Sequence, residues 1–250
     1  MLLFQVAHRL IVKEKIDKKD IPRFILCGLF GVAINQLLFF KGLSLTNPVN
    51  AALMMTTNPL QVMLFAFLII NERISAIKLA GIILGFTGAI LIIASGGNFS
   101  FSSQTFVGDL CIFFNSLSYA LFIVLVKPLL SKYRPLTVMK WVFTFGVLVV
   151  IPFGYNEFLQ VEWNSIVFVD WLRIIFVVIG TTFIAYLLNT FALQRLSPSV
   201  VSAYIYSQPV FATLMGIIIG TGYPHLIHYI AAIFIFSGIY LAGIYKAKTN

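Results

Sequence analysis

Long stretches without a charged side chain are the feature that most constrains how this chain can fold. With histidine left aside, seven of them occur, at residues 24–40, 42–71, 79–108, 110–126, 141–156, 174–194 and 196–245. A helix needs about 20 apolar residues to cross the hydrocarbon core of a bilayer. The last stretch is interrupted at residues 220–224 and therefore holds two such helices. Because 60% of the residues are hydrophobic and only 10% are charged, an ordinary soluble domain is excluded.

The uncharged stretches predict an all-α fold, a polytopic membrane helix bundle. The alternating pattern of a membrane β-barrel is absent, and in lipid only helices can then satisfy the backbone. We expect eight spans, at about residues 22–43, 49–70, 76–95, 108–130, 136–154, 171–193, 199–220 and 226–245. Residues 1–12 are too short to span a bilayer and lack the cleavage site of a signal peptide.

An internal repeat organises these spans. After an offset of 150 positions, Pro48, Pro59 and Gly88 recur as Pro198, Pro209 and Gly238, which indicates a duplication. The same offset places the partners of two helices at or before Met1, so eight helices are present of an expected ten. Five helices per repeat give two halves of opposite orientation, the plan of many secondary transporters. We expect an incomplete first unit at 1–97, an external linker at 98–107 and a complete second unit at 108–250.

The basic residues predict the orientation in the membrane. If the C-terminus is cytoplasmic and the spans alternate, fifteen of the seventeen lysines and arginines fall on the inner side, and only Lys41 and Arg173 fall outside. This bias predicts that both termini are cytoplasmic, with a bacterial cytoplasmic membrane as the expected location. The net charge of +9 lies in short turns between spans, so it predicts orientation in the bilayer and no nucleic-acid partner.

Several motifs resemble one transporter family. They are the turn Thr46-Asn47-Pro48-Val49-Asn50-Ala51-Ala52, the Asn58-Pro59 pair in the next helix, Glu72-Arg73 at its inner end and the glycine-rich helix that follows. Together they are similar to the EamA family of the drug/metabolite transporter superfamily, from Ile21 onward. The resemblance implies two five-helix units that move amino acids, nucleotide-derived compounds or other small metabolites, commonly outward. The sequence departs from the pattern at Gly222, which stands where the first unit has Glu72.

Polar residues within the spans are the candidate substrate-binding residues, because each is costly in lipid unless it faces a partner or a cavity. The candidates are Asn35, Asn58, Gln61, Asn115, Tyr119, Asn189, Tyr204 and Gln208. Asn58 and Gln208 precede Pro59 and Pro209, so we expect both near the midplane and facing a central cavity. Each proline is expected to leave backbone carbonyls, at Met54 and Tyr204, open to a ligand. The alternative for each residue is a hydrogen bond between helices.

Other site chemistry finds no support in the sequence. No nucleophile with a base, phosphate loop or metal-ligand cluster appears, so we expect no enzyme, cofactor or metal. Pro59, Pro209 and Glu72 are expected to act as structural or hinge residues. The function that we expect is export of a small metabolite, such as an amino acid or a related compound, by alternating access. The alternative is a truncated accessory or scaffold protein that does not transport, and a homodimer is possible in either case.

Overall fold

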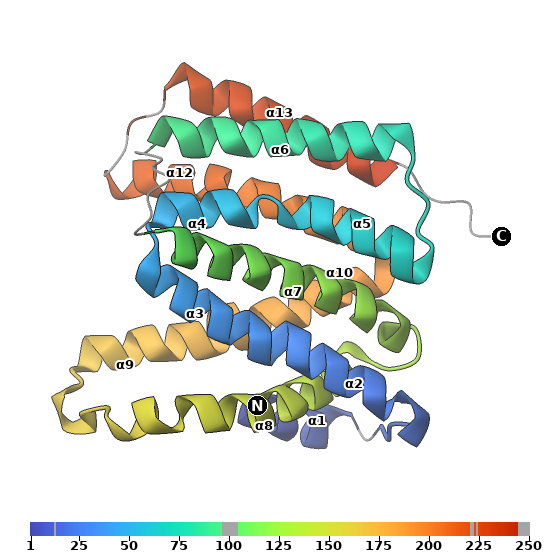
Figure 1. The fold of residues 1–250 in the computed structure, drawn as a ribbon, viewed down its shortest axis with the longest axis vertical. Coiled ribbons are helices and arrows are strands. Elements are labelled where there is room, and N and C mark those ends of the chain that lie inside the picture. Colours follow the sequence, from blue (N-terminus) through green and yellow to red (C-terminus); the bar gives the residue numbers. More distant parts are fainter. Residues whose placement is uncertain (13, 97–104, 221–222, 224, 245–250) are drawn as a thin grey trace. The chain divides into compact units, whose positions relative to one another are not determined.

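The computed structural model describes residues 1–12, 14–96, 105–220, 223 and 225–244 (Figure 1). Within these residues the chain is helical and contains no strand. In the described part of the chain, eight helical segments are long and apolar enough to cross a membrane, which confirms the predicted fold class. Most of the expected linker at 98–107 lies outside the described residues. The chain divides into two compact units, each of which takes helices from both sequence repeats.

Unit 1 comprises Met1–Leu37 and Leu125–Leu196. It includes one end of α3 (Asn35–Leu45) and one end of α7 (Phe106–Leu130). Its other elements are α1 (Leu2–Ile11), η1 (Lys18–Asp20), α2 (Ile21–Gly28), η2 (Leu29–Ile34), α8 (Pro135–Leu159), η3 (Trp163–Ser165), α9 (Phe168–Ile175), η4 (Phe176–Ile184) and α10 (Ala185–Arg195). Helix α8 continues five residues past Gly154, where we expected it to end. A glycine inside a helix costs only about 1 kcal/mol relative to alanine, so it does not by itself end one.

Close backbone approach and aromatic contacts hold unit 1 together. A Cβ added to Gly28 of α2 would lie 2.8 Å from the backbone nitrogen of Gly146 in α8, so only glycine fits this crossing. The Phe4 ring of α1 packs against Phe143 at 4.8 Å and Phe183 at 4.6 Å between ring centroids. Helix α1, although too short to span, is therefore anchored to α8.

The widened helical turns of unit 1 follow the repeat. The π-helices η2 and η4 end at Ile34 and Ile184, which are 150 positions apart. In each case an ordinary α-helix follows directly, α3 (Asn35–Leu45) or α10. Single turns of π-helix are uncommon and occur often at functional sites. The duplicated segments thus share a local backbone feature that residue identity alone did not reveal.

Unit 2 comprises Leu38–Val124 and Ser197–Asn250. Besides parts of α3 and α7 (Phe106–Leu130), its elements are α4 (Pro48–Met55), α5 (Asn58–Ile70), α6 (Ala76–Gly96), α11 (Pro198–Ala203), η5 (Tyr204–Ser207), α12 (Gln208–Ile219) and α13 (Leu226–Ile244). Helices α6 and α13 lie side by side (Figure 1). Their buried side chains, among them Ile82, Ala89, Ile235 and Ile239, form a hydrophobic core together with Tyr206.

Small residues allow α6 and α13 to touch along their backbones. A Cβ on Gly81 would lie 2.6 Å from the carbonyl oxygen of Gly238, and a Cβ on Gly88 would lie 2.8 Å from that of Ala231. Since Gly81 corresponds to Ala231 and Gly88 to Gly238 in the repeat, these are the same contact made twice. By contrast, a Cβ added to Gly220 would meet no described atom within 4 Å, and this glycine ends α12 in a left-handed conformation, with φ of 79°.

Candidate functional site

Two helix breaks in unit 2 occupy matching positions of the repeat. Helix α4 ends at Met55 and α5 begins at Asn58, while α11 ends at Ala203 and α12 begins at Gln208 after the short 3-10 turn η5. In both cases a proline is the second residue of the new helix, where its missing N–H is not needed. The predicted interruptions at Pro59 and Pro209 are therefore present as discontinuous helices.

The two carbonyls that we expected to be open are occupied. Thr57 Oγ1 donates to the Met54 carbonyl at 2.6 Å, and Ser207 Oγ donates to the Tyr204 carbonyl at 2.6 Å. The expectation that these oxygens await a ligand is wrong, because a hydroxyl three residues later already satisfies each of them. Thr57 and Ser207 are themselves repeat partners, so both breaks use the same local chemistry.

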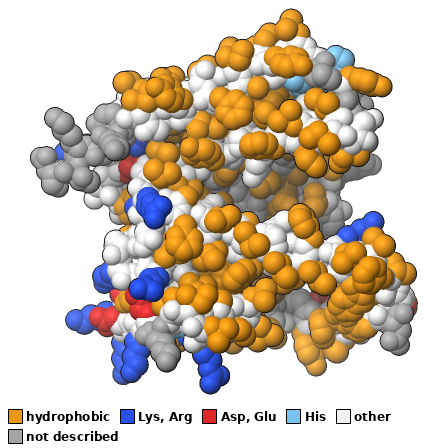
Figure 2. All heavy atoms as spheres, turned by 180° about the vertical axis from the view of Figure 1, so that it is seen from behind, with side chains coloured by type: hydrophobic (Ala, Val, Ile, Leu, Met, Phe, Trp, Pro, Cys, Tyr) orange, Lys and Arg blue, Asp and Glu red, His pale blue; other side chains and the backbone are white. Residues whose placement is uncertain are grey.

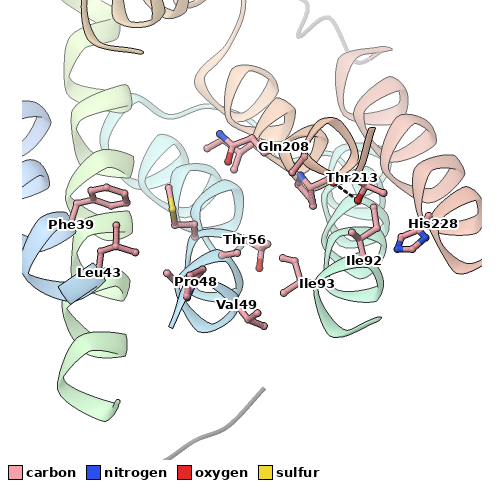
Figure 3. Close-up of a pocket in the computed structure, with 16 residues that line it drawn as sticks. Phe39, Leu43, Pro48, Val49, Thr56, Ile92, Ile93, Gln208, Thr213 and His228 are labelled. Atoms are coloured by element: carbon pink, nitrogen blue, oxygen red, sulfur yellow. Dashed lines mark hydrogen bonds between the residues drawn. The ribbon is translucent and has the colours of Figure 1, made fainter. Parts of the chain in front are cut away.

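A groove of about 480 Å³ lies in unit 2 and is bordered by both breaks (Figure 3). The first break contributes Met55 and Thr56, and the second contributes Ile205, Gln208 and Pro209. The remaining lining comes from α3, α4, α6, α12 and α13. Its volume falls within the range of about 300–1,000 Å³ of small-molecule sites in proteins.

The chemistry of the groove is apolar with a few neutral polar groups. Thr56, Gln208 and Thr213 supply hydroxyl and amide groups, and among the described lining residues only His228 has a titratable side chain. Thr213 Oγ1 donates to the Pro209 carbonyl at 2.8 Å (Figure 3), and the Nδ1 atom of His228 accepts from the His225 amide at 2.9 Å. Among the described lining residues there is no carboxylate and no lysine or arginine.

The predicted residues of α5 form a separate polar network with α7. Asn58 Nδ2 donates to the Ser116 carbonyl at 2.7 Å, Ser116 Oγ donates to Gln61 Oε1 at 2.8 Å, and Gln61 Nε2 donates to Thr57 Oγ1 at 3.0 Å. Asn58 and Gln61 are buried and do not line the groove, whereas Gln208 is exposed into it. The matched amides Asn58 and Gln208 thus lie in different local environments of unit 2.

Three more candidates lie in unit 2. Asn115 is buried on α7, and Tyr119 is half-buried with its ring 5.8 Å from that of Phe122. Tyr204 is 54% exposed and does not line the groove, whereas its neighbour Tyr206 is fully buried. No described contact tests a substrate-binding role for any of these residues, so that role stays a prediction.

Two candidates belong to unit 1. Asn35 lies directly after the π-helix η2, where the Tyr186 hydroxyl lies 3.5 Å from its Oδ1 and donates to the Gly31 carbonyl at 3.1 Å. Asn189 is half-buried on α10. Their substrate-binding role likewise stays a prediction.

Glu72 takes part in a buried ion pair within unit 2. Lys78 Nζ lies 2.6 Å from Glu72 Oε1, and the two side chains are only 2% and 9% exposed. The pair closes the turn between α5 and α6, since the backbone amide of Lys78 also bonds to Ser75. This arrangement fits the structural role that we expected for Glu72.

Sequence reasoning missed a buried carboxylate at the start of α7. Asp109 is 3% exposed and accepts a hydrogen bond from the Thr46 hydroxyl. Its two carboxylate oxygens also accept from Asn50 Nδ2, Oδ1 at 3.2 Å and Oδ2 at 3.1 Å. Asn47 caps α4 in the same turn by accepting from the Asn50 backbone amide at 2.8 Å. The motif around Asn47 and Asn50 is the sequence feature that could have indicated this contact, because the Asn50 side-chain amide needs a hydrogen-bond acceptor when it is buried.

Comparison with known proteins agrees with this architecture. A family model described as "EamA-like transporter family" matches residues 1–94 and 106–244. An "Uncharacterized transporter" from Archaeoglobus fulgidus is 27% identical over 86% of this chain and 73% of its own length. The "Uncharacterized transporter YyaM" from Bacillus subtilis is 26% identical over 88% and 72%.

Two further similarities concern substrate and fold. A Streptantibioticus cattleyicolor protein named "Probable terminal-alkyne amino-acid exporter" is 25% identical over 54% of this chain and 44% of its own length. A solved structure titled "Crystal structure of protein" superposes with a TM-score of 0.79 at 21% identity, over 96% of this chain and 83% of that one. This second similarity shows a shared fold.

Proposed function

Since this chain belongs to the EamA-like transporter family, we propose that it is a secondary transporter that exports a small metabolite, such as an amino acid or a related compound. The amino-acid exporter among its relatives supports the substrate class. Catalysis has no part in the proposal, because the named relatives are transporters and the described residues of the groove include no nucleophile paired with a base.

One observation carries this proposal. The two repeat-related helix breaks, at Thr56–Thr57 and Tyr204–Ser207, border the same groove of unit 2. Discontinuous helices beside a binding site are typical of transporters built from inverted repeats. A ligand in this groove would contact both repeats at once, so a relative movement of the breaks would change its surroundings.

The lining favours a neutral or zwitterionic substrate with an apolar part. Gln208 can donate to and accept from such a molecule. Thr56 can accept from it, because its own hydroxyl donates to the Leu53 carbonyl at 2.6 Å, while Ile92, Ile93 and Phe39 supply apolar contact. A net charge on the substrate would lack a partner, since the described lining has no carboxylate, lysine or arginine. We propose alternating access by rocking of the repeats, without proton coupling through a groove carboxylate.

Counterflow in proteoliposomes tests the proposal directly. The full chain, reconstituted and loaded with unlabelled amino acids, should accumulate labelled leucine, phenylalanine or alanine, and should not accumulate glutamate or lysine. Gln208→Leu removes a hydrogen-bonding group from the groove and should weaken apparent affinity roughly tenfold. Gln160→Leu, the same change at an exposed position of unit 1, is the matched control.

The results separate the alternatives. Exchange of charged amino acids in preference to neutral ones would refute the substrate assignment. Equal affinity of Gln208→Leu and Gln160→Leu would refute the groove as the binding site. If no labelled solute exchanges, the accessory or scaffold role becomes the better account of this chain.

We also propose the membrane orientation given by the basic residues, with both termini cytoplasmic in a bacterial cytoplasmic membrane. Single cysteines at the exposed positions Ser165 and Ser131, in a background with Cys27 and Cys111 replaced by alanine, report on it. In intact cells an impermeant thiol reagent should label Ser165→Cys and spare Ser131→Cys. Equal labelling of the two positions would contradict this topology.

A further inference from the structure

Unit 1 contains a second cavity, of about 440 Å³, between α1 and α8. Its lining consists of Gln5, Val6, His8, Arg9, Val12 and Lys140. Every ionisable side chain in this lining is basic, in contrast to the neutral groove of unit 2. None of its lining residues lines the groove of the proposed transport site.

The contact between Lys140 and His8 defines how the histidine is protonated. Lys140 Nζ lies 3.3 Å from His8 Nδ1, and because an ammonium can only donate, Nδ1 must accept and Nε2 must carry the hydrogen. Burial and the Lys140 charge both lower the pKa of His8, whereas Glu14 acts in the opposite direction. His8 is 6% exposed, and its Nε2 is buried without a hydrogen bond to any described residue.

Of the other polar side chains of the lining, Gln5 holds α1 against α8 and Arg9 adds positive charge. Gln5 Nε2 donates to Thr144 Oγ1 at 2.7 Å, which ties α1 to α8. Arg9 is exposed at the cavity edge. The nearby carboxylate of Glu14 accepts from the backbone amide of Arg134 at 3.1 Å and does not belong to the lining. The lining therefore holds two cationic side chains, Lys140 and Arg9, and a histidine whose Nε2–H has no hydrogen-bond partner among the described residues.

The position of the cavity suits the border between headgroups and hydrocarbon. Lys140 lies five residues into α8 from Pro135, which is about 7.5 Å along the helix. The headgroup layer on each side of a bilayer is about 5–8 Å thick. Outside the cavity lining, Leu2, Leu10 and Ile11 of α1 are 72%, 79% and 71% exposed. Lysine and arginine also gather near this end of unit 1 (Figure 2).

We propose that this cavity binds the phosphate of an acidic phospholipid headgroup. The phosphate oxygens accept from Lys140 and from the Nε2–H of His8, with Arg9 at the outer edge. The acyl chains lie along Val6, Val12 and the exposed apolar face of α1. A free phosphate offers the same oxygens but would leave this apolar surface unused, which favours the lipid.

Binding of short-chain lipids to the purified full chain tests the proposal. Lys140 Nζ lies 5.0 Å from the centroid of the Trp141 ring, so Trp141 fluorescence reports on the cavity once Trp163 and Trp171 are replaced by phenylalanine. The probes are dioctanoyl phosphatidylglycerol, dioctanoyl phosphatidylcholine and inorganic phosphate. Phosphatidylglycerol should bind saturably, and Lys140→Gln should weaken it at least about tenfold. Lys41→Gln, at an exposed lysine of unit 2, should leave binding unchanged.

Each other result overturns the assignment. Unchanged phosphatidylglycerol affinity in Lys140→Gln would show that the cavity is not the site. Inorganic phosphate bound as tightly as phosphatidylglycerol would assign the cavity to a soluble anion. Equal affinity for phosphatidylcholine would show that the positive charge plays no part. If Lys140→Gln does not fold, Arg9→Gln, at an exposed position, provides the same comparison, and wild-type affinity in that variant would also refute the proposal.

Discussion

Replacing Gly238 by alanine should force α6 and α13 apart. The added Cβ would lie 2.5 Å from the Gly81 carbonyl oxygen and 2.6 Å from the Gly85 nitrogen. These are backbone atoms inside a helix, so no rotamer change can relieve the clash. To reach an ordinary contact of 3.4 Å, the two helices must separate by most of an ångström. A radial gap of about 0.5–1 Å weakens the dispersion energy of each contact across it by roughly a quarter to a half.

The expected loss is about 1–3 kcal/mol, the usual cost of overpacking a tight interior. Thermal unfolding of the purified chain in detergent, followed by circular dichroism, measures it. Gly243→Ala is a matched control on the same helix, because a Cβ there meets no atom of a described residue within 4 Å and alanine favours the helix by up to about 1 kcal/mol. The reasoning fails if Gly238→Ala and Gly243→Ala have the same melting temperature.

Two other substitutions test the buried charges of unit 2. Lys78→Met leaves Glu72 buried without its partner and should destabilise the chain by about 3–5 kcal/mol. Adding Glu72→Gln should restore much of the lost stability in the same thermal assay. If the double variant is no more stable than Lys78→Met, the ion pair does not explain the loss. Asp109→Leu removes the acceptor shared by Thr46 and Asn50 and should cost about 1–3 kcal/mol. Asp109→Asn keeps an acceptor oxygen and should cost less, so equal losses would contradict this account.

The sequence predicted the number and kind of spans because charge is so costly in lipid that uncharged length marks a helix. It also predicted the helix breaks at Pro59 and Pro209, since a proline removes a backbone donor, although Pro128 and Pro152 lie inside α7 and α8 without ending them. It could not show that the hydroxyls of Thr57 and Ser207 would satisfy the Met54 and Tyr204 carbonyls. That outcome depends on side-chain rotamers at the break.

The candidate site was harder to predict because it depends on which face of a helix is buried. Asn58 and Gln208 hold the same place in the repeat, yet the first is buried against α7 and the second is exposed into the groove. Asp109 lies at the start of a helix, where the helix dipole stabilises an acidic side chain even when it is exposed to solvent. This position alone therefore gave no reason to expect that Asp109 is buried. Its burial becomes visible only when Gly108 is seen to pack against the backbone of Leu45 and Thr46.

The glycine contact between α6 and α13 has a consequence for the origin of the molecule. Because Gly81 meets Gly238 as Ala231 meets Gly88, each helix offers the other the surface that it receives, as in the self-complementary interface of a symmetric dimer. Two separate polypeptides, each carrying one copy of the repeat, present the same pair of surfaces. Gene fusion can therefore join two such polypeptides without changing the interface between them. Later substitutions at Gly81 or Gly88 then alter the two ends of this one ancestral interface separately.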